Sequence, residues 1–297
     1  MKYIDIHGHI NFPDYDKERS VGIGDRKEVI KRAQYAGVGI IIVGTDFESS
    51  KAVVEFAEKH ENMWAIIGVH PTHVGEVNFG GTNTGKTDLS SSTGHEAWRE
   101  LAINHKVVAI GECGLDYFHP GPVNMTVEEY KESQRKVFIQ HIELANEVGK
   151  PLMLHVRNGK SEARNSFVIG VGVDGVNAYQ EAVSLLKEYA KVPANFHFFA
   201  GTEQDLKEII KIGALVSFTG VITFTRDYDE LIRQVPIDRI MSETDCPFVA
   251  PVPYRGKRNE PTYVIEVVKK IAEIRGESEE KISAQLLENT KKFFKIS

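Results

Sequence analysis

Ile4-Asp5-Ile6-His7-Gly8-His9 is the stretch from which the fold and the chemistry of the chain can be worked out. An apolar run that leads into two histidines predicts a buried strand ending in polar side chains. In an extended chain, residues i and i+2 leave the same face, so the two imidazoles would lie roughly 6 to 7 Å apart. Imidazole nitrogen binds zinc and other first-row divalent cations well. The pair therefore indicates half of a metal site that needs carboxylates from elsewhere in the chain.

The composition is that of a globular protein. Hydrophobic residues make up 41% of the 297 positions, enough for a sizeable core in one or two domains. The net charge of −6 excludes an overall basic field, so a phosphate-bearing substrate would have to be attracted locally. No apolar run reaches the ~18 residues of a membrane span, and Met1 leads directly into a predicted strand rather than a signal peptide. We therefore expect a soluble, cytoplasmic monomer with no membrane partner.

Short apolar runs alternate with longer amphipathic stretches along almost the whole chain. This alternation predicts buried strands that pair in parallel through helical crossovers. The predicted strands are 2–7, 39–43, 64–69, 107–112, 151–155, 195–199, 214–218 and 239–243. The predicted helices are 26–35, 50–60, 95–105, 126–148, 177–189, 203–212, 227–234, 260–275 and 278–294. About eight such units predict an α/β fold, a TIM (β/α)8 barrel in a single domain over residues 1–297, with an open doubly wound sheet as the alternative.

Two segments interrupt the alternation. Residues 78–93 are rich in Gly, Thr and Ser and have no periodicity, and residues 161–175 form a second irregular stretch after the fifth strand. Both follow a predicted strand. In a barrel they would therefore be inserted loops on the face where the strands end, which is the active-site face.

Histidines and acidic residues gather at the ends of the predicted strands. They are His7, His9, His70, Glu112, His155, His197 and Asp245. A lone buried histidine is more often a core residue than a ligand, but random placement would also scatter histidines among the helices, where only four are predicted. In a barrel the carboxyl ends of the strands meet at one rim, so these distant residues would become neighbours. The joint pattern therefore predicts a metal centre.

Four imidazoles and two carboxylates exceed the ligands of one tetrahedral ion. Two ions would use them all, and the predicted arrangement is His7, His9 and Asp245 on one ion, a bridging Glu112, and His155 and His197 on the other. Two ions about 3.5 to 4 Å apart can lower the pKa of a shared water and clamp both oxygens of a phosphoryl displacement. Asp245 would then also accept the proton of the water. The two cysteines fit no paired ligand spacing, which argues against a thiolate site.

Six motifs in chain order give the sequence a resemblance to a known family. They are Asp5-Ile-His-Gly-His9, Gly68-Val-His-Pro71, Gly111-Glu-Cys-Gly-Leu-Asp-Tyr117, Leu154-His-Val-Arg157, Phe196-His-Phe-Phe-Ala-Gly201 and Ser242-Glu-Thr-Asp-Cys-Pro-Phe248. The stretch 253–261 continues the match, which runs from residue 4 to about 263. On these residues the chain resembles the TatD family of metal-dependent deoxyribonucleases in the amidohydrolase-type barrel superfamily.

The resemblance implies a TIM barrel, two divalent metal ions (Mg, Mn or Zn) and hydrolysis of phosphodiester bonds in DNA. It also implies a 3'-5' exonuclease acting mainly on single-stranded DNA ends, and by matching position it assigns the metal ligands as above. Glu112 separates the chain from superfamily members that use a carboxylated lysine there, because no lysine occurs from 109 to 114. The chain departs from the family in the insertions 78–93 and 161–175, which bear on substrate preference, and at 198–200.

Four further residues are predicted to contact the substrate. His70 would donate a hydrogen bond to a phosphate or protonate the leaving alkoxide, with a structural role beside Pro71 as the alternative. Arg157 shares the direction of His155, so its guanidinium could bind a phosphate near the second ion unless it forms a structural salt bridge. Arg255 and Arg258 belong to the concentrated basic patch that follows the eighth strand, and we predict that they contact the phosphate backbone.

The main prediction is thus a two-metal deoxyribonuclease. A metal-dependent hydrolase of small amides, lactones or phosphoesters is the alternative, because one barrel serves many chemistries. A binding or scaffold protein without catalysis is a third class, which the full set of predicted ligands disfavours.

Overall fold

Eight parallel strands pair in chain order in the computed structural model, which describes residues 1–16, 25–74, 92–123, 125–159 and 177–297. They are β1 (Tyr3–Gly8), β2 (Val38–Val43), β3 (Met63–Ile67), β4 (Val107–Asp116), β5 (Leu152–Arg157), β6 (Ala194–Phe196), β7 (Leu215–Phe218) and β8 (Ile240–Ser242). The eight predicted strands are confirmed. The main difference is β4, which continues four residues past its predicted end at Glu112.

β1 and the segment after β8 bring the two edges of the sheet together. Gly8 forms a parallel bridge with Cys246. The backbone N–H of His9 donates to the carbonyl of Cys246 at 2.7 Å, and that of Asp245 donates to the carbonyl of His7 at 2.9 Å. The strands therefore form a nearly closed barrel, which confirms the predicted TIM-type fold and excludes the open sheet.

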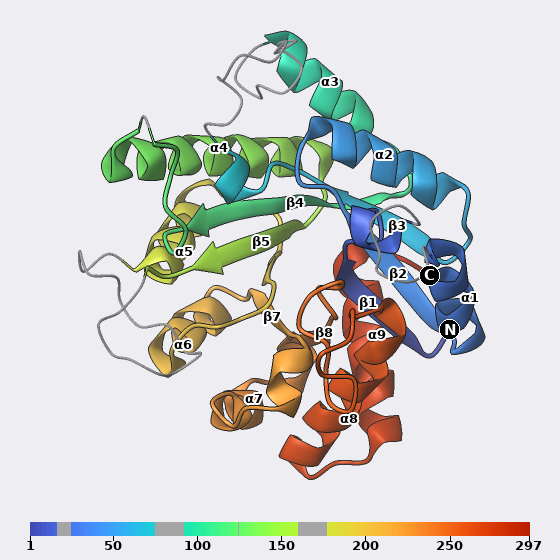
Figure 1. Cartoon of the computed structure of the whole chain (residues 1–297). Helices are drawn as coiled ribbons and strands as arrows, with labels where there is room; N and C mark the ends of the chain where they lie inside the picture. The colour runs from blue at the N-terminus through green and yellow to red at the C-terminus, as the bar shows by residue number, and fades with distance from the viewer. Residues whose placement is uncertain (17–24, 75–91, 124, 160–176) are drawn as a thin grey trace.

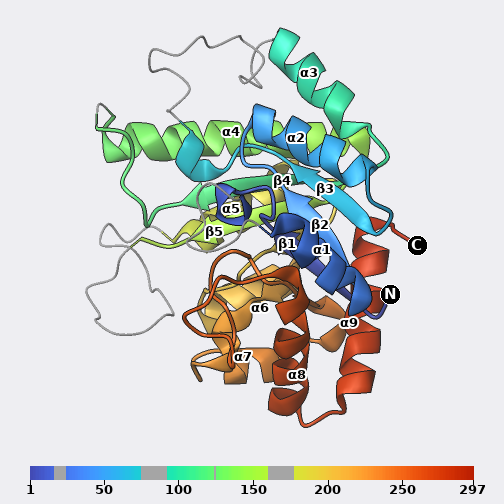
Figure 2. The ribbon, with the colours of Figure 1, turned by 45° about the vertical axis from the view of Figure 1, so that its right-hand side comes forward.

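Helices cover the outside of the strands (Figures 1 and 2). They are α1 (Arg26–Tyr35), α2 (Phe47–Glu58), α3 (Ser92–Ala102), α4 (Val127–Val148), α5 (Ala178–Tyr189), α6 (Glu203–Lys211), α7 (Asp229–Gln234), α8 (Val264–Arg275) and α9 (Glu279–Phe294). α2 starts earlier than predicted because Asp46 caps it, accepting a hydrogen bond from the backbone N–H of Ser49 at 2.7 Å. α8 starts later than predicted because a 3-10 turn (Pro261–Tyr263) precedes it.

Apolar residues form one layer inside the barrel and another between the strands and the helices. β2 and β4 are buried along their whole length, as expected for strands covered on both faces. The inner layer includes Ile41, Ile66 and Met153, and α9 packs Phe293 and Phe294 against it. The interior also holds the buried Asn195, whose side-chain amide donates to the hydroxyl of Ser217 at 2.8 Å.

The two predicted insertions fall on residues that are mostly not described. Residues 161–175 lie outside the described residues, and of 78–93 only the start of α3 at Ser92 is described. Within the described part of the chain, no helix is both long enough and apolar enough to cross a bilayer.

Candidate metal centre

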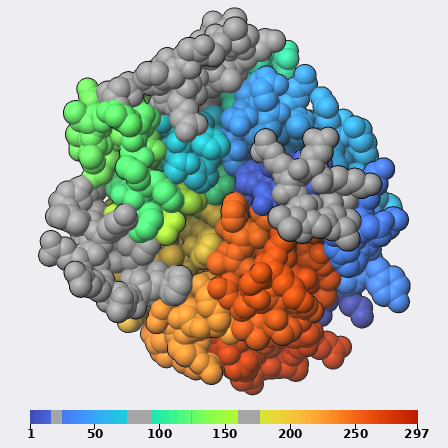
Figure 3. All heavy atoms as spheres, in the orientation of Figure 1, coloured from blue at the N-terminus to red at the C-terminus, as the bar shows by residue number. Residues whose placement is uncertain are grey.

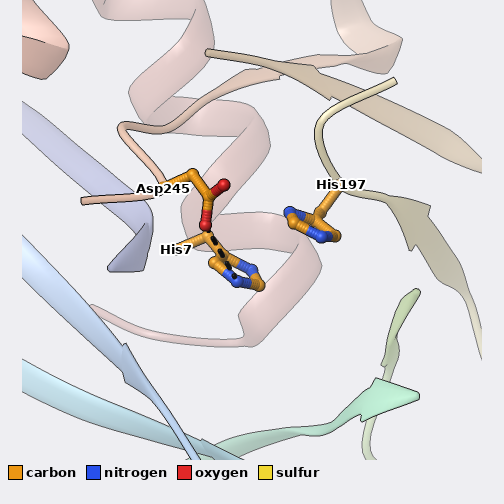
Figure 4. A group of neighbouring side chains, drawn as sticks. All are labelled: His7, His197 and Asp245. Carbon is orange, nitrogen blue, oxygen red and sulfur yellow. Dashed lines mark ion pairs between the residues drawn. The ribbon is translucent and has the colours of Figure 1, made fainter. Parts of the chain in front are cut away.

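The six predicted metal ligands lie together, five of them at or near the carboxyl ends of their strands and Glu112 within β4. His7 and His9 come from the end of β1, Glu112 from β4, His155 from β5, His197 from the residue after β6 and Asp245 from the segment after β8. Their side chains are 0% to 18% exposed. Figure 4 shows three of them, His7, His197 and Asp245, close together although they are distant in the sequence.

Local backbone features direct these side chains inward. The strand registers shift between Asp5 and Gly8 and between Ile110 and Cys113, which are the places that carry His7 and Glu112. Such irregularities re-aim a side chain at a barrel rim. At Gly8 a Cβ atom would lie 3.0 Å from the sulfur of Cys246, so a residue without a side chain lets the two segments approach.

The backbone of Asp245 has a φ of 54°, in the left-handed region that aspartate adopts more readily than most residues. A hydrogen bond from the N–H of Phe248 to the carbonyl of Asp245, at 3.0 Å, closes the turn that follows. This conformation directs the carboxylate toward the two histidines of β1, with Oδ1 3.6 Å from Nε2 of His9 and 3.9 Å from Nε2 of His7.

Glu112 lies between two groups of imidazoles. Its Oε2 is 3.3 Å from Nε2 of His7 and 3.7 Å from Nε2 of His9. Its Oε1 is 2.8 Å from Nε2 of His197 and 3.0 Å from Nδ1 of His155. Each carboxylate oxygen therefore lies next to one pair of histidines, as expected for a ligand that bridges two ions.

Three of the imidazoles have a hydrogen-bond acceptor beside the ring nitrogen that faces away from Glu112. Nδ1 of His9 lies 3.2 Å from the carbonyl oxygen of Val43, which can only accept. Nδ1 of His197 faces a carboxylate oxygen of Glu243 at 3.2 Å, and Nε2 of His155 faces one of Asp116 at 2.9 Å. In the neutral ring that a metal ligand requires, each proton would therefore sit on the outer nitrogen, and the lone pair of the inner nitrogen would face Glu112.

When the rings are neutral, lone pairs that converge on carboxylates repel one another unless a metal ion lies among them. Nε2 of His7 and Nε2 of His9 are 3.3 Å apart, and Nδ1 of His155 and Nε2 of His197 are 3.2 Å apart. Nitrogen and carboxylate donors of this kind suit Zn, Mn and related ions. The residues present therefore fit metal binding on either side of Glu112.

The two sides of the centre differ in their electrostatics. Burial and the neighbouring His7 lower the pKa of His9 to about 3, so this imidazole is neutral. Burial also disfavours a charge on His155, but its hydrogen bonds to Asp116 and Glu112 outweigh burial and raise its pKa to about 9. The pKa of Glu112 is held well below its usual range, against the effect of burial, by the surrounding histidines. Glu112 is therefore a carboxylate, as a ligand must be.

Three overlapping groups of residues have possible ligand atoms within 4.8 Å of one another. They are His7, His9 and Glu112; His7, His197 and Asp245; and His70, Glu112 and His155. In the last group, Nε2 of His70 is 3.5 Å from Oε1 of Glu112. His70 therefore lies closer to the metal ligands than contact with the substrate alone would require.

His70 has a defined tautomer as well. Its Nδ1 accepts the backbone N–H of Thr72 at 3.2 Å and lies 2.6 Å from the hydroxyl of Thr72. A bare Nδ1 satisfies both contacts, so the neutral ring carries its proton on Nε2, the nitrogen that faces Glu112. Burial lowers the pKa of His70 to about 4, which keeps the ring neutral near pH 7.

The three predicted phosphate-binding arginines lie in different environments. The guanidinium of Arg157 stacks 3.9 Å from the ring centre of Phe118, and that of Arg255 stacks 3.8 Å from that of Phe224. Arg258 instead pairs with Asp25 at 2.5 Å and donates to the carbonyl of Asp14 at 2.9 Å. Figure 3 shows the segment after β8, in orange, on the surface beside the blue amino-terminal segment.

Sequence reasoning missed two kinds of contributor. Asp5 is fully buried and accepts two hydrogen bonds from Thr244, at 2.8 and 2.6 Å. The indication in the sequence was that Asp5 precedes His7 by two residues. The rings of Phe12 and Phe248 lie beside the site, and each follows a predicted metal ligand by three residues. No periodic pattern singles them out.

Comparison with known proteins places these residues in a family. The family model described as TatD related DNase matches residues 4–295. The chain belongs to the TatD related DNase family. The predicted resemblance is thereby confirmed.

Two relatives and one solved structure show how far the likeness extends. An uncharacterized metal-dependent hydrolase of Bacillus subtilis, YabD, is 34% identical over 99% of this chain and 99% of its own length. The 3'-5' ssDNA/RNA exonuclease TatD of Pantoea vagans is 31% identical over 92% of this chain and 94% of its own length. The crystal structure of the TatD homolog YJJV from Escherichia coli superposes with a TM-score of 0.76 at 25% identity, covering 100% of this chain and 99% of that one.

Proposed function

We propose that this chain is a two-metal hydrolase that cleaves phosphodiester bonds in nucleic acid, removing nucleotides from the 3' end of single strands. The observation that carries the proposal is Glu112, with a pair of imidazoles at each of its two carboxylate oxygens. Membership of the TatD related DNase family supports phosphodiester hydrolysis. The direction and strand preference rest on the name of the Pantoea relative.

The proposed ligand sets follow the two sides of Glu112. His7, His9 and Asp245 would hold one divalent ion, His155 and His197 the other, with Glu112 between them. Mg, Mn or Zn would be the ion. When bound, the pair would lower the pKa of a water molecule and withdraw charge from the phosphate oxygens.

The side chains around the centre would take different parts in the reaction. Asp245 is the most exposed carboxylate of the set, at 13% of its side chain, so a water molecule can reach it and pass it a proton. On the His155 side of Glu112, the neutral His70 would donate a hydrogen bond from Nε2–H to an oxygen of the leaving group, without giving up its proton. Arg157 and Arg255 would attract the phosphates, whereas Arg258 is a weaker candidate because Asp25 already pairs with it.

The test combines substrate choice with metal content. Single-stranded oligonucleotides labelled at either end would be compared with small amides, lactones and phosphoesters, each with Mg, Mn or Zn. We expect stepwise shortening from the 3' end, with about two ions per chain. Glu112→Gln should lower the bound metal and the activity together.

Two variants examine the proton acceptor within the same assay. Asp245→Asn should reduce turnover by about 10²- to 10⁴-fold. Asp14→Asn, which changes an exposed carboxylate on the nearby 3-10 turn, should leave turnover unchanged. Cleavage of a small ester with every oligonucleotide left intact would reject the nuclease and favour the alternative hydrolase.

A further inference from the structure

Phe248 is an exposed aromatic side chain at the edge of the candidate metal centre. The residue is 52% exposed, whereas every other phenylalanine among the described residues is buried or partly buried. It follows Asp245 by three positions in the turn after β8. Single apolar side chains are common on protein surfaces, so exposure alone does not indicate a function; the position of this ring beside a polar site, in contact with a second aromatic ring, does suggest one.

A chain of ring contacts connects Phe248 to a metal-ligand candidate. The ring of Phe12 stacks on that of His9, with centroids 4.5 Å apart and planes at 20°. The edge-to-face contact between Phe12 and Phe248 has a centroid distance of 6.3 Å and an angle of 77°. The two phenylalanines thus form an aromatic pair beside the half of the centre that contains His7, His9 and Asp245.

The backbone that carries Phe248 is held firmly. Its N–H donates to the carbonyl of Asp245 at 3.0 Å. Its carbonyl accepts from the side chain of the buried Asn259 at 2.6 Å, and the same amide group donates to the carbonyl of Thr244 at 2.9 Å. Because the backbone is already ordered, less conformational freedom is lost when a flat partner stacks on the ring, so the arrangement favours binding.

We propose that Phe248, supported by Phe12, is a stacking site for the nucleobase next to the scissile phosphodiester. The inference rests on the proposed nuclease function and adds to it the part of the substrate that the aromatic pair recognises. Every nucleobase has a flat face, so a phenyl ring with no hydrogen-bonding group would bind bases with little sequence preference. A single strand is the substrate that leaves this face free.

The test combines a change in the protein with a change in the substrate, as in a double-mutant cycle. Phe248→Ala would be compared with wild type on a single-stranded oligonucleotide and on the same strand with an abasic residue at the terminal or the penultimate position. We expect kcat/KM on the intact strand to fall by about 5- to 150-fold, and the fall to disappear on one abasic strand. Phe248→Tyr keeps an aromatic face and should restore activity, and Val252→Ala, an exposed apolar control on the same segment, should have no effect.

A binding measurement gives a readout that does not depend on turnover. With EDTA present to stop cleavage, a strand carrying 2-aminopurine at the responsive position should lose fluorescence on binding wild type but not Phe248→Ala. Equal losses of activity on intact and abasic strands, or equal quenching by both proteins, would overturn the stacking site. Failure of wild type to cleave any oligonucleotide would instead reject the proposed function.

Discussion

At the scale of single residues, Glu243 is the carboxylate that contacts both halves of the candidate metal centre. It is fully buried, and its Oε1 accepts the backbone N–H of Phe198 at 2.6 Å. Its Oε2 lies 3.2 Å from Nδ1 of His197 and 3.8 Å from Nδ1 of His7. Nδ1 of His7 makes no hydrogen bond to any described residue, so Glu243 is its nearest acceptor. Glu243 thus orients His197 through a hydrogen bond and lies near His7, one histidine from each side of Glu112.

Glu243→Gln keeps the size of the side chain but puts an amide N–H₂ where a carboxylate oxygen accepts. Either Phe198 N–H or His197 Nδ1–H then loses its acceptor. Because such outer partners tune ligand basicity, we expect the affinity for Mn or Zn to fall by about 10- to 100-fold, with activity recovered at high metal concentration. Metal titration by calorimetry measures the change.

Glu147→Gln is the matched control for this substitution. Glu147 pairs with Arg99 and with His95 on the helical surface, where its side chain is 41% exposed. It should leave metal affinity unaltered. If Glu243→Gln bound metal as tightly as Glu147→Gln, Glu243 would have no role in orienting the ligands.

The basic patch gives a second prediction at the same scale. Arg255 is exposed and stacks on Phe224, whereas Arg258 is held by Asp25. We expect Arg255→Ala to reduce the slope of log affinity against log salt by about 0.7, the value for one single-strand phosphate contact, and Arg258→Ala to leave it unchanged. Binding of an oligonucleotide in EDTA between 50 and 200 mM salt would measure the slopes. Equal slopes for wild type and Arg255→Ala would contradict the contact.

Spacing in the sequence predicted which residues would gather, but not how each imidazole would be oriented. His7, His9, Glu112, His155, His197 and Asp245 do converge, because strand ends meet on one rim. The proton positions depend on acceptors such as Val43 O and Glu243, and these partners are set by packing between distant segments. No local pattern encodes them.

At the scale of secondary-structure elements, His141 joins α4 to the end of β3. Its Nδ1 lies 2.7 Å from the carbonyl of Val137, one turn earlier in α4. Its Nε2 accepts the backbone N–H of Val69 at 2.9 Å, so the ring is neutral with the proton on Nδ1. Burial lowers the pKa of His141 from 6.5 to about 4.

This shift makes the docking of α4 depend on pH. Between pH 6.5 and 4 the unfolded chain binds a proton at His141 and the folded chain does not, so stability falls as the pH falls. From pH 7.5 to 5 the contribution of this group is a loss of about 2 kcal/mol. In urea unfolding, the free energy of unfolding of His141→Gln should fall by about 2 kcal/mol less than that of the wild type between pH 7.5 and 5. Parallel stability curves for the two proteins would refute the role of His141.

Helix starts show what the sequence could not decide at this scale. The apolar periodicity of α2 predicts a helix from about residue 50, but the start depends on which of several neighbouring oxygens caps it. Asp46 and Ser49 form a reciprocal pair, with the hydroxyl of Ser49 accepting the N–H of Asp46 at 3.0 Å. By contrast α4 begins next to its predicted start at residue 126, where Thr126 and Glu129 form a capping box.

At the scale of the whole molecule, the barrel depends on the junction between its first and last strands. The seven other neighbouring pairs are joined by ladders, whereas β1 meets the segment after β8 at one bridge. The alternation of strands and helices predicts a barrel, but closure depends on polar groups that this pattern does not reveal. The two chain ends lie near each other in Figures 1 and 2, and α9 contacts both β1 and β8.

Asp5 and Thr244 hold this junction together. Oδ1 of Asp5 accepts the backbone N–H of Thr244, and Oδ2 accepts its hydroxyl. The hydroxyl oxygen in turn accepts the N–H of Cys246 at 3.2 Å, so the contact fixes the residues on both sides of Asp245. Thr244 is fully buried, and no water can replace Asp5 without entering the interior.

Asp5→Ala would leave the N–H and the hydroxyl of Thr244 without their acceptor in the interior. We expect a loss of about 3 kcal/mol in the free energy of unfolding, together with weaker metal binding because Asp245 is no longer held. Asp5→Asn keeps an acceptor for the N–H and a group that can bond the hydroxyl, so its loss should be smaller. Thr244→Val removes only the hydroxyl and should cost about 1 kcal/mol. Urea unfolding of the three variants measures the order of their losses in the free energy of unfolding. If Asp5→Ala were as stable as Asp5→Asn, the barrel would close without this contact.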